Sequence, residues 1–334
     1  MAAAAWIYPG PPADDAQQVY RARGRRGWPS LRVQYFLLSS EGVLQRMDED
    51  EYGTNGYSPA NAADVRAHAR AAWITVAGEH TGAAAMLAPT PEGRQRAAQA
   101  LAAIRDLVVA CDFDGAELDI EGAWQFSADE FAAYVRWSAA LGDALHAAGR
   151  RLIVTVPPSR PRHWTNAAFG DAHPCDYVTV MAYDYQYDCP GRAIAPFHFV
   201  RRVVGWLRED LGPAAADRKL VVGLPAYSYS CRDLAPAQLE AGEPADVKVL
   251  TYAQALRDGA GGDPQAIAAA PADPESGERV LRRNGRVFFV STAASLDAKR
   301  RVAEEAGARR FCVWHLGGGN PWFTRDAALA PDVA

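Results

Sequence analysis

The chain has few lysines and few cysteines. Lys219, Lys248 and Lys299 are the only lysines among 334 residues, and the formal net charge is −5. This charge argues against a nucleic-acid partner. The five cysteines show no C-x-x-C spacing, which argues against a zinc ribbon or a redox pair. Their odd number excludes a fully paired disulfide framework and leaves room for one bridge.

Long apolar runs are also missing. No stretch reaches the roughly 20 apolar residues of a membrane span, so we expect no membrane association. The first ten residues, MAAAAWIYPG, lack the basic segment and the long apolar segment of a signal peptide. The compartment therefore stays open between a cytoplasmic protein and a secreted mature form whose leader has been removed. We expect no cofactor, no metal and a monomeric state.

Short β-branched or aromatic runs alternate with alanine-rich stretches of helical periodicity. Eight such runs are predicted to be strands, at residues 3–9, 31–40, 71–79, 113–121, 151–158, 177–186, 220–230 and 310–318. The longer helices are predicted at residues 93–110, 127–149, 195–210 and 293–307. Ser127 and Glu130 have the spacing of a capping box, which predicts that a helix begins at Ser127.

Most of these strands are apolar on both faces, which is typical of a parallel sheet covered by helices. We predict an α/β protein with a closed (β/α)8 TIM barrel, formed by residues 1–231 and 291–334. Residues 232–290 are predicted to form a small α+β insertion between the seventh strand and its helix. Asn284-Gly285 predicts a hairpin turn inside that insertion. A doubly wound open sheet is the alternative, although no G-x-G-x-x-G motif stands at a first turn.

One predicted strand carries an unusual pattern of charge. In FDGAELDIE, residues 113–121, the acids Glu117, Asp119 and Glu121 alternate with apolar residues. Alternate residues of a strand share one face, so three carboxylates lie within about 7 Å of their neighbours. Like charges this close disfavour full ionisation, and at least one acid should hold a proton. A protonated acid beside an ionised one suits glycoside hydrolysis.

Two other interpretations of the acidic strand stay open. The acids could line a solvated edge strand, or they could pair with buried arginines. An oxygen-only Mg²⁺ site is the second alternative, since no histidine lies nearby to recruit a transition metal. Chelation would abolish the activity of such a magnesium enzyme.

The same stretch resembles the D-x-x-D-x-D-x-E signature of family 18 glycoside hydrolases, the group of chitinases and endo-β-N-acetylglucosaminidases. Asp114, Asp119 and Glu121 match this signature, whereas Glu117 stands where the family usually has aspartate.

Three later segments are similar to further motifs of that family, in the same order. They are VMAYDY at 180–185, GLPAY at 223–227 and VWHLGG at 313–318. The resemblance covers most of residues 70–325, including the place of the insertion. It is greatest for the bacterial spore-cortex-lytic branch, which acts on peptidoglycan containing N-acetylglucosamine.

The resemblance implies a catalytic role for five residues. Glu121 would be the general acid and would later activate water. Asp119 would orient the acetamido N–H of the substrate and stabilise positive charge, with Glu117 below it sharing charge or a proton. Tyr183 would donate a hydrogen bond to the acetamido carbonyl, and Asp184 would position the same sugar.

Other residues are predicted to bind the sugar. Trp314 would form an apolar floor under the ring. The further predicted substrate-binding residues are Met181, Tyr185, Gln186, Tyr227 and Trp124. Alternate residues of the last predicted strand point into the barrel, and His315 is one position away from them, so we expect it to be structural.

The sequence therefore predicts a retaining glycoside hydrolase that cleaves β-linkages in glycans containing N-acetylglucosamine, such as chitin, peptidoglycan or N-glycans. Catalysis would be assisted by the acetamido group of the substrate and would pass through an oxazolinium intermediate. The partner would be an oligo- or polysaccharide containing N-acetylhexosamine. The alternative is a non-catalytic, lectin-like carbohydrate-binding barrel of the same family.

Overall fold

Eight parallel strands form a closed barrel. A computed structural model describes residues 4–9, 15–161, 164 and 167–321. The first strand pairs with both the second and the last, which closes the sheet. The barrel strands are β1 Ala4–Ile7, β2 Trp28–Leu38, β4 Ala69–Gly78, β5 Gly115–Ile120, β6 Arg151–Val156, β7 Tyr177–Met181, β8 Leu220–Pro225 and β13 Phe311–Trp314. The predicted TIM barrel is confirmed, and the doubly wound open sheet is excluded.

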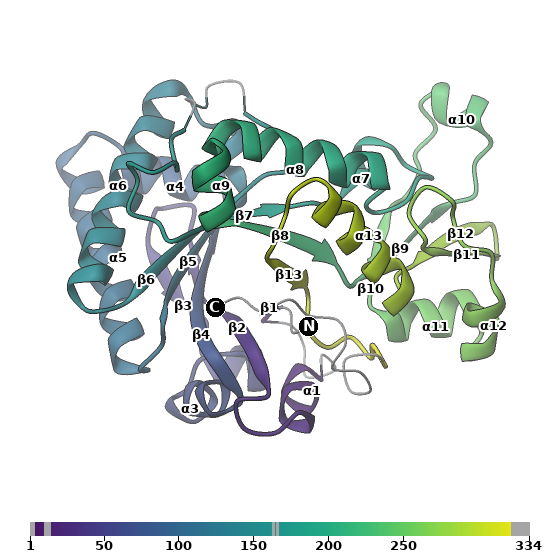
Figure 1. The fold of residues 1–334 in the computed structure, drawn as a ribbon, viewed down its shortest axis with the longest axis horizontal. Helices are drawn as coiled ribbons and strands as arrows, with labels where there is room; N and C mark the ends of the chain where they lie inside the picture. Colours follow the sequence, from purple (N-terminus) through teal and green to yellow (C-terminus); the bar gives the residue numbers. More distant parts are fainter. Residues whose placement is uncertain (1–3, 10–14, 162–163, 165–166, 322–334) are drawn as a thin grey trace.

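Helices wrap around the outside of the barrel (Figure 1). The longer ones are α1 Ala16–Ala22, α3 Pro59–His68, α4 His80–Leu87, α5 Pro91–Ala110, α6 Ala128–Ala147, α8 Phe197–Leu211, α9 Pro213–Lys219 and α13 Ala293–Glu305. Short elements are β3 Leu44–Arg46, α2 Glu49–Tyr52, the 3-10 turns η1 Gly53–Asn55 and η2 Glu121–Gln125, and α7 Tyr185–Asp188. Between β6 and β7, the described residues 157–161, 164 and 167–176 form neither helix nor strand.

The alternation of side chains along the strands separates two apolar layers. Ala116, Leu118 and Ile120 of β5 are buried in the core between the barrel and its helices, as the pattern predicts. A smaller cluster fills the barrel interior and consists of Ala4, Trp6, Trp73, Ile153, Tyr177, Val221 and Cys312. The opposite face of β5 therefore points into the barrel.

Helix α6 begins with the predicted capping box. Ser127 Oγ accepts a hydrogen bond from the Glu130 amide at 3.3 Å, and Glu130 Oε2 accepts one from the Ser127 amide at 2.8 Å. We expect Ser127→Ala to lower the free energy of unfolding by about 1 kcal/mol. The Glu130 amide loses its acceptor, and the hydrogen bond from the amide of residue 127 to the Glu130 side chain becomes less ordered. Urea denaturation measures this loss. The exposed Ser159 offers a control, and equal effects of Ser127→Ala and Ser159→Ala would contradict the expectation.

A second, antiparallel sheet forms the core of the insertion, at the right of Figure 1. Its strands follow the order β10-β9-β12-β11 and are β9 Ser228–Arg232, β10 Lys248–Leu250, β11 Arg279–Arg283 and β12 Arg286–Val290. Three helices accompany it, namely α10 Pro236–Glu240, α11 Tyr252–Ala260 and α12 Pro264–Ala269. Asn284 and Gly285 have φ of 51° and 70°, which agrees with the predicted hairpin turn. The domain boundaries stay a prediction, and the small sheet itself begins at Ser228.

Three predicted strands end earlier than the sequence pattern indicates. The prediction at 310–318 is wrong beyond Trp314, where β13 ends. The other two end where the backbone turns away from the barrel. The prediction at 177–186 is wrong beyond Met181, because Asp184 adopts a left-handed conformation with φ of 70° and α7 follows it. The prediction at 220–230 is wrong beyond Pro225, because Ser228 already belongs to the second sheet. In both segments the apolar and aromatic pattern continues past the point where the backbone turns away from the barrel.

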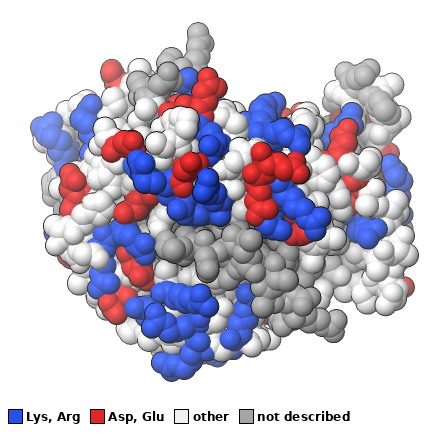
Figure 2. Space-filling view, in the orientation of Figure 1, with Lys and Arg blue, Asp and Glu red and all other residues white. Residues whose placement is uncertain are grey.

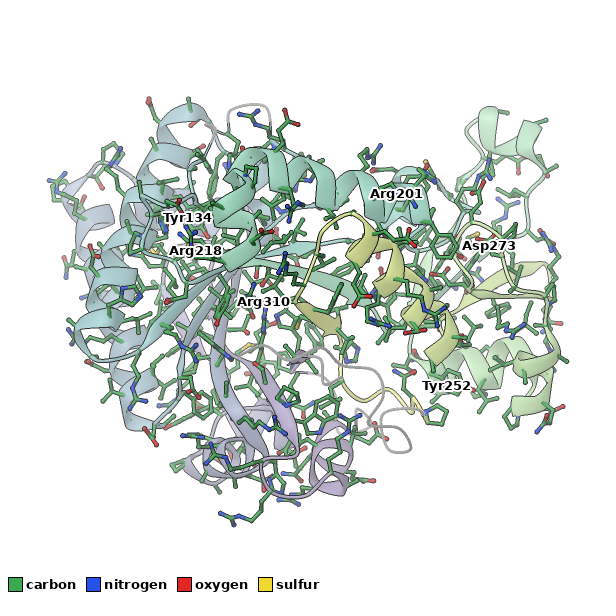
Figure 3. All side chains as sticks on the ribbon, viewed as in Figure 1. Tyr134, Arg201, Arg218, Tyr252, Asp273 and Arg310 are labelled. Atoms are coloured by element: carbon green, nitrogen blue, oxygen red, sulfur yellow. The ribbon has the colours of Figure 1, made fainter. Side chains whose placement is uncertain are left out.

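The surface carries both signs of charge. Figure 2 shows acidic and basic side chains intermingled, with basic residues gathered at the lower edge. Arg21, Arg25 and Arg26, which precede β2 in the chain, are exposed. Figure 3 labels the buried Tyr134 of α6 and the exposed Arg218 of α9. All five cysteines are free. Within the described residues, no helix is both long and apolar enough to cross a membrane.

Candidate active site

The carboxyl ends of the barrel strands surround a cavity of about 440 Å³. This end of a TIM barrel is where active sites form. The cavity lining includes six of the predicted site residues, namely Asp119, Glu121, Tyr183, Asp184, Tyr227 and Trp314. They come from four different strands or the turns directly after them, so the closed barrel brings together residues that are far apart in the sequence.

Two acids of the FDGAELDIE stretch face this cavity. Asp119 lies in β5 and is 4% exposed, while Glu121 follows the strand and begins η2. The Oδ1 atom of Asp119 has no hydrogen-bond partner among the described residues. A buried polar atom without a partner costs free energy unless a proton or a ligand satisfies it. Asp119 therefore lines the cavity with acceptor capacity that no described residue uses.

Both of these acids hold their protons more tightly than ordinary carboxyls. Burial raises the pKa of Asp119 well above its usual value, Glu121 and Glu117 raise it further, and Arg32 opposes them. Burial also raises the pKa of Glu121, with added repulsion from Asp184 and Glu79. A carboxyl with a raised pKa can donate a proton at a pH where a surface glutamate is already ionised.

Asp184 is held by two neighbours at the edge of the cavity. The Tyr227 hydroxyl donates a hydrogen bond to Asp184 Oδ1, and Gln186 Nε2 donates to the same oxygen at 3.3 Å. Burial raises the pKa of Asp184, and these two hydrogen bonds oppose that effect. Gln186 is fully buried and lies behind Asp184, outside the cavity lining. The left-handed backbone at Asp184, which aspartate tolerates better than most residues, directs this side chain.

Aromatic rings form one wall of the cavity. Trp314 meets Tyr8 edge-to-face, with ring centroids 5.4 Å apart, and both rings line the cavity. Tyr183 is buried and stands perpendicular to Tyr227 at 6.1 Å. Burial and the nearby Asp119 raise the pKa of Tyr183 well above its usual value. Its hydroxyl therefore stays protonated and can act as a donor.

Four predicted residues lie outside the cavity lining besides Gln186. Glu117 is fully buried and pairs with Arg32, so the alternative of an acid paired with a buried arginine applies to this residue. Met181 packs against the core, and Tyr185 packs against Phe199 with ring centroids 5.1 Å apart. Trp124 is 60% exposed. The substrate-binding roles of Met181, Tyr185, Gln186 and Trp124 stay predictions.

Several cavity residues escaped the sequence analysis. They are Tyr8, Gln34, Leu37, Ala77, Gly78, Glu79, Tyr187, Val249 and His315. Tyr8 and Glu79 directly follow β1 and β4, so their position after a barrel strand was the available signal. His315 was expected to be structural, because alternation along its predicted strand directed it away from the barrel interior. It lines the cavity instead, because β13 ends at Trp314 and the alternation of side chains ends with it.

Within the described parts of the chain, no group of three or more His, Cys, Asp and Glu side chains is placed to hold a metal ion.

The chain matches the model of the glycosyl hydrolases family 18 over residues 36–316. No significant match is found among the curated proteins.

Solved structures share the fold at low sequence identity. The spore cortex-lytic enzyme SleL of Bacillus cereus is 17% identical, with a TM-score of 0.73 over 97% of this chain and 72% of that one. The chitinase of Chromobacterium violaceum is 20% identical, with a TM-score of 0.69 over 97% of both chains. The class V chitinase of Nicotiana tobaccum is 16% identical, with a TM-score of 0.71 over 97% of this chain and 96% of that one. Because the family model matches most of its length, the chain belongs to the glycosyl hydrolases of family 18.

Proposed function

We propose that this glycoside hydrolase cleaves β-linkages in glycans containing N-acetylglucosamine, with retention of configuration and with assistance from the substrate's own acetamido group. One observation carries the proposal. The proton-holding Glu121 lines the same cavity as Asp119, whose buried Oδ1 lacks a partner among the described residues. The proposed reaction needs a proton donor for the glycosidic oxygen and an acceptor for the acetamido N–H. Glu121 and Asp119 offer these two functions at one cavity.

In the first step, Glu121 gives its proton to the glycosidic oxygen as the bond to the anomeric carbon breaks. The carbonyl oxygen of the 2-acetamido group attacks the anomeric carbon and forms an oxazolinium ring. In the second step, the ionised Glu121 takes a proton from water, which attacks the same carbon and reopens the ring. Two displacements at one carbon restore the original configuration.

Two residues would stabilise the charge that develops in the acetamido group. The Asp119 carboxylate would accept the acetamido N–H, which acquires positive character as the ring forms. The protonated Tyr183 hydroxyl would donate to the acetamido oxygen and hold it near the anomeric carbon. Asp184, fixed by Tyr227 and Gln186, would hold the same sugar in place.

The cavity and the relatives support the proposed substrate class. The rings of Trp314, Tyr8 and Tyr187 line the cavity and offer apolar faces to a pyranose ring. A structure of the Nicotiana tobaccum class V chitinase holds NAG4, and this relative shares the fold of the chain. Chitin-like, peptidoglycan and N-glycan oligosaccharides all carry the acetamido group that the mechanism needs.

Release of reducing ends from a panel of oligosaccharides tests this proposal. The panel contains chito-oligosaccharides, peptidoglycan fragments and N-glycans, with cello-oligosaccharides of equal length as controls that lack the acetamido group. We expect turnover of at least one N-acetylated substrate and none of the controls. Tight binding without turnover of any substrate would instead favour the lectin-like alternative, and equal hydrolysis of the controls would exclude substrate assistance.

A further inference from the structure

The carboxylate of Glu117 is saturated with hydrogen bonds. Its Oε1 accepts from Arg32 Nη1 at 2.5 Å and from Thr155 Oγ1 at 2.9 Å. Its Oε2 accepts from Trp6 Nε1 at 2.6 Å and from Thr75 Oγ1 at 2.9 Å. Four donors, two of them threonine hydroxyls, fill the roughly four acceptor positions that a carboxylate offers. The carboxylate of Glu117 therefore has its hydrogen-bond partners on β1, β2, β4 and β6 and none on Asp119.

Arg32 supplies the opposite charge from β2. Its side chain is 0% exposed, and Nη1 also donates to Thr179 Oγ1 at 2.9 Å. The guanidinium lies over the ring of Trp6, 5.1 Å from its centroid. An arginine cannot release its proton in a protein, so a buried one needs a counter-ion. Glu117 is that counter-ion, and the two side chains form a neutral pair inside the barrel.

The reach of the side chain explains why residue 117 is a glutamate. Strand β4 lies between β5, which carries Glu117, and β2, which carries Arg32. The carboxylate must also meet Trp6 on β1 and Thr155 on β6. An aspartate is one methylene shorter, so it would leave some of these four donors, or the arginine itself, without a partner.

Asp119 sits directly above this pair, two residues along β5. Glu121, Glu117 and Arg32 are the charged groups that act on it. Tyr183 beyond β7 and Tyr134 on α6 also face it, and burial raises the pKa of both phenols so that they stay neutral. Near Arg32, burial likewise raises the pKa of the Cys312 thiol of β13, which stays neutral. Glu117 and Arg32 act on Asp119 with opposite charges, so the net charge of this pair determines its electrostatic effect on Asp119.

We propose that Glu117 and Arg32 act together as a charge-balanced pair of positioning residues that sets the ionisation of Asp119, and that glutamate is required at position 117 to reach the arginine. The inference rests on the proposed function, because Asp119 is assigned there to the acetamido group.

The pH dependence of kcat/KM in charge-altered variants tests this pair. Glu117→Gln leaves the Arg32 cation without its counter-ion, which favours the ionised form of Asp119. We expect the acidic limb of the profile, which reports that ionisation, to move to lower pH by about one unit. The cation also opposes the positive charge of the transition state, so kcat/KM at the optimum should fall about tenfold. The double variant Glu117→Gln/Arg32→Gln restores neutrality, and its acidic limb should return to the wild-type position.

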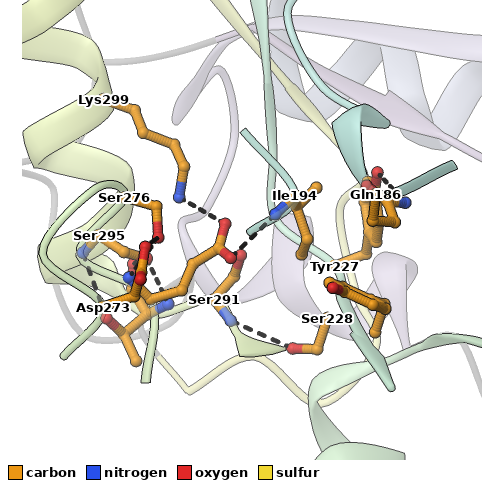
Figure 4. Close-up of polar contacts among 12 residues, drawn as sticks. Gln186, Ile194, Tyr227, Ser228, Asp273, Ser276, Ser291, Ser295 and Lys299 are labelled. Atoms are coloured by element: carbon orange, nitrogen blue, oxygen red, sulfur yellow. Dashed lines mark hydrogen bonds and ion pairs between the residues drawn. The ribbon is translucent and has the colours of Figure 1, made fainter. Parts of the chain in front are cut away.

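A second buried ion pair provides the matched control. Lys299 Nζ of α13 lies 2.8 Å from Glu278 Oε1, both side chains are 0% exposed, and Glu278 Oε2 accepts from the Ile194 amide (Figure 4). Glu278→Gln should lower the melting temperature without moving the acidic limb, because Glu278 is not among the charges acting on Asp119.

Three outcomes would overturn the proposed role of Glu117 and Arg32. They are an unmoved limb in Glu117→Gln, a double variant that lies no closer to wild type than the single variant, and an equal shift in Glu278→Gln. If the single variant does not fold, a limb in the double variant displaced by a full pH unit would overturn it as well. Absence of wild-type turnover would overturn the proposed function and this inference with it, whereas wild-type turnover with an unmoved limb counts against the pair alone.

Discussion

Glu121→Gln is expected to lower kcat by about 10²- to 10⁴-fold, the usual contribution of a positioned general acid. The amide has nearly the same size as the carboxyl but cannot donate a proton to the leaving oxygen. Substrate contacts elsewhere in the cavity are kept, so KM should change little. Initial rates on the best N-acetylated substrate of the panel measure both constants.

Glu79→Gln is the matched control for this loss. Glu79 also lines the cavity and adds to the repulsion that raises the pKa of Glu121, but it has no proton-transfer role in the proposed mechanism. Its side chain is exposed, so solvent screens its charge and the change in kcat should stay below about tenfold. Undiminished kcat in Glu121→Gln, or an equal loss in both variants, would refute the assignment of Glu121.

Asp119→Asn should make the enzyme slower and more stable at the same time. Loss of a charge aimed at the forming oxazolinium should lower kcat by about 10²- to 10³-fold. The pKa of Asp119 is raised in the folded state, so folding binds a proton that the unfolded chain releases. The stability from this site is present below the unfolded pKa, about 4, and is lost as pH rises through the folded value. Asparagine does not ionise and avoids that loss.

Scanning calorimetry at pH 7 and pH 4 measures the stability effect. The melting temperature of Asp119→Asn should exceed that of the wild type by on the order of 2 °C at pH 7, and the difference should vanish at pH 4. Asp112→Asn is a control of opposite sign, because a hydrogen bond from Arg150 lowers the pKa of Asp112. A melting temperature of Asp119→Asn below that of the wild type at pH 7 would contradict the prediction.

The opposed effects at Asp119 illustrate how the site depends on the rest of the barrel. A buried acid with an unpartnered oxygen and two carboxyl neighbours destabilises the fold on its own. Saturated hydrogen bonding around Glu117 and dense packing of β5 against the helices offset that cost. Catalytic groups can then occupy positions that would be unfavourable in a free-standing strand.

The barrel itself could be predicted from local sequence patterns. Most strands appear as short apolar runs, because strands of a parallel sheet are buried on both faces, and β5 appears as an alternation of acids with apolar residues. The ends of β7 and β8 could not be predicted in the same way. The chain turns at Asp184 and enters the second sheet at Ser228, although the apolar and aromatic pattern continues through both points.

Site residues could be predicted where the alternation of side chains along a strand sets their direction. They could not be predicted where their role depends on a partner far away in the sequence. Alternation correctly directed Glu117 and Asp119 away from the helices. It could not identify Arg32 as the partner of Glu117, because 85 residues separate them and only closure of the barrel brings them together. Arg32 did leave one signal, a charge inside the otherwise apolar run LRVQYFLL. Tyr8 and Glu79 were missed because they stand at the ends of the predicted strands 3–9 and 71–79, where position alone does not distinguish a cavity residue from a strand residue.

Proton NMR of the first product released from chitotetraose tests substrate-assisted retention most directly. The anomeric signal distinguishes the newly formed reducing end before mutarotation mixes the two forms. Two successive displacements at the anomeric carbon predict that the β-anomer appears first and that the α-anomer accumulates only later. Initial release of the α-anomer by the wild-type enzyme would show a single displacement by water and would contradict the roles assigned to the acetamido group, Asp119 and Glu121.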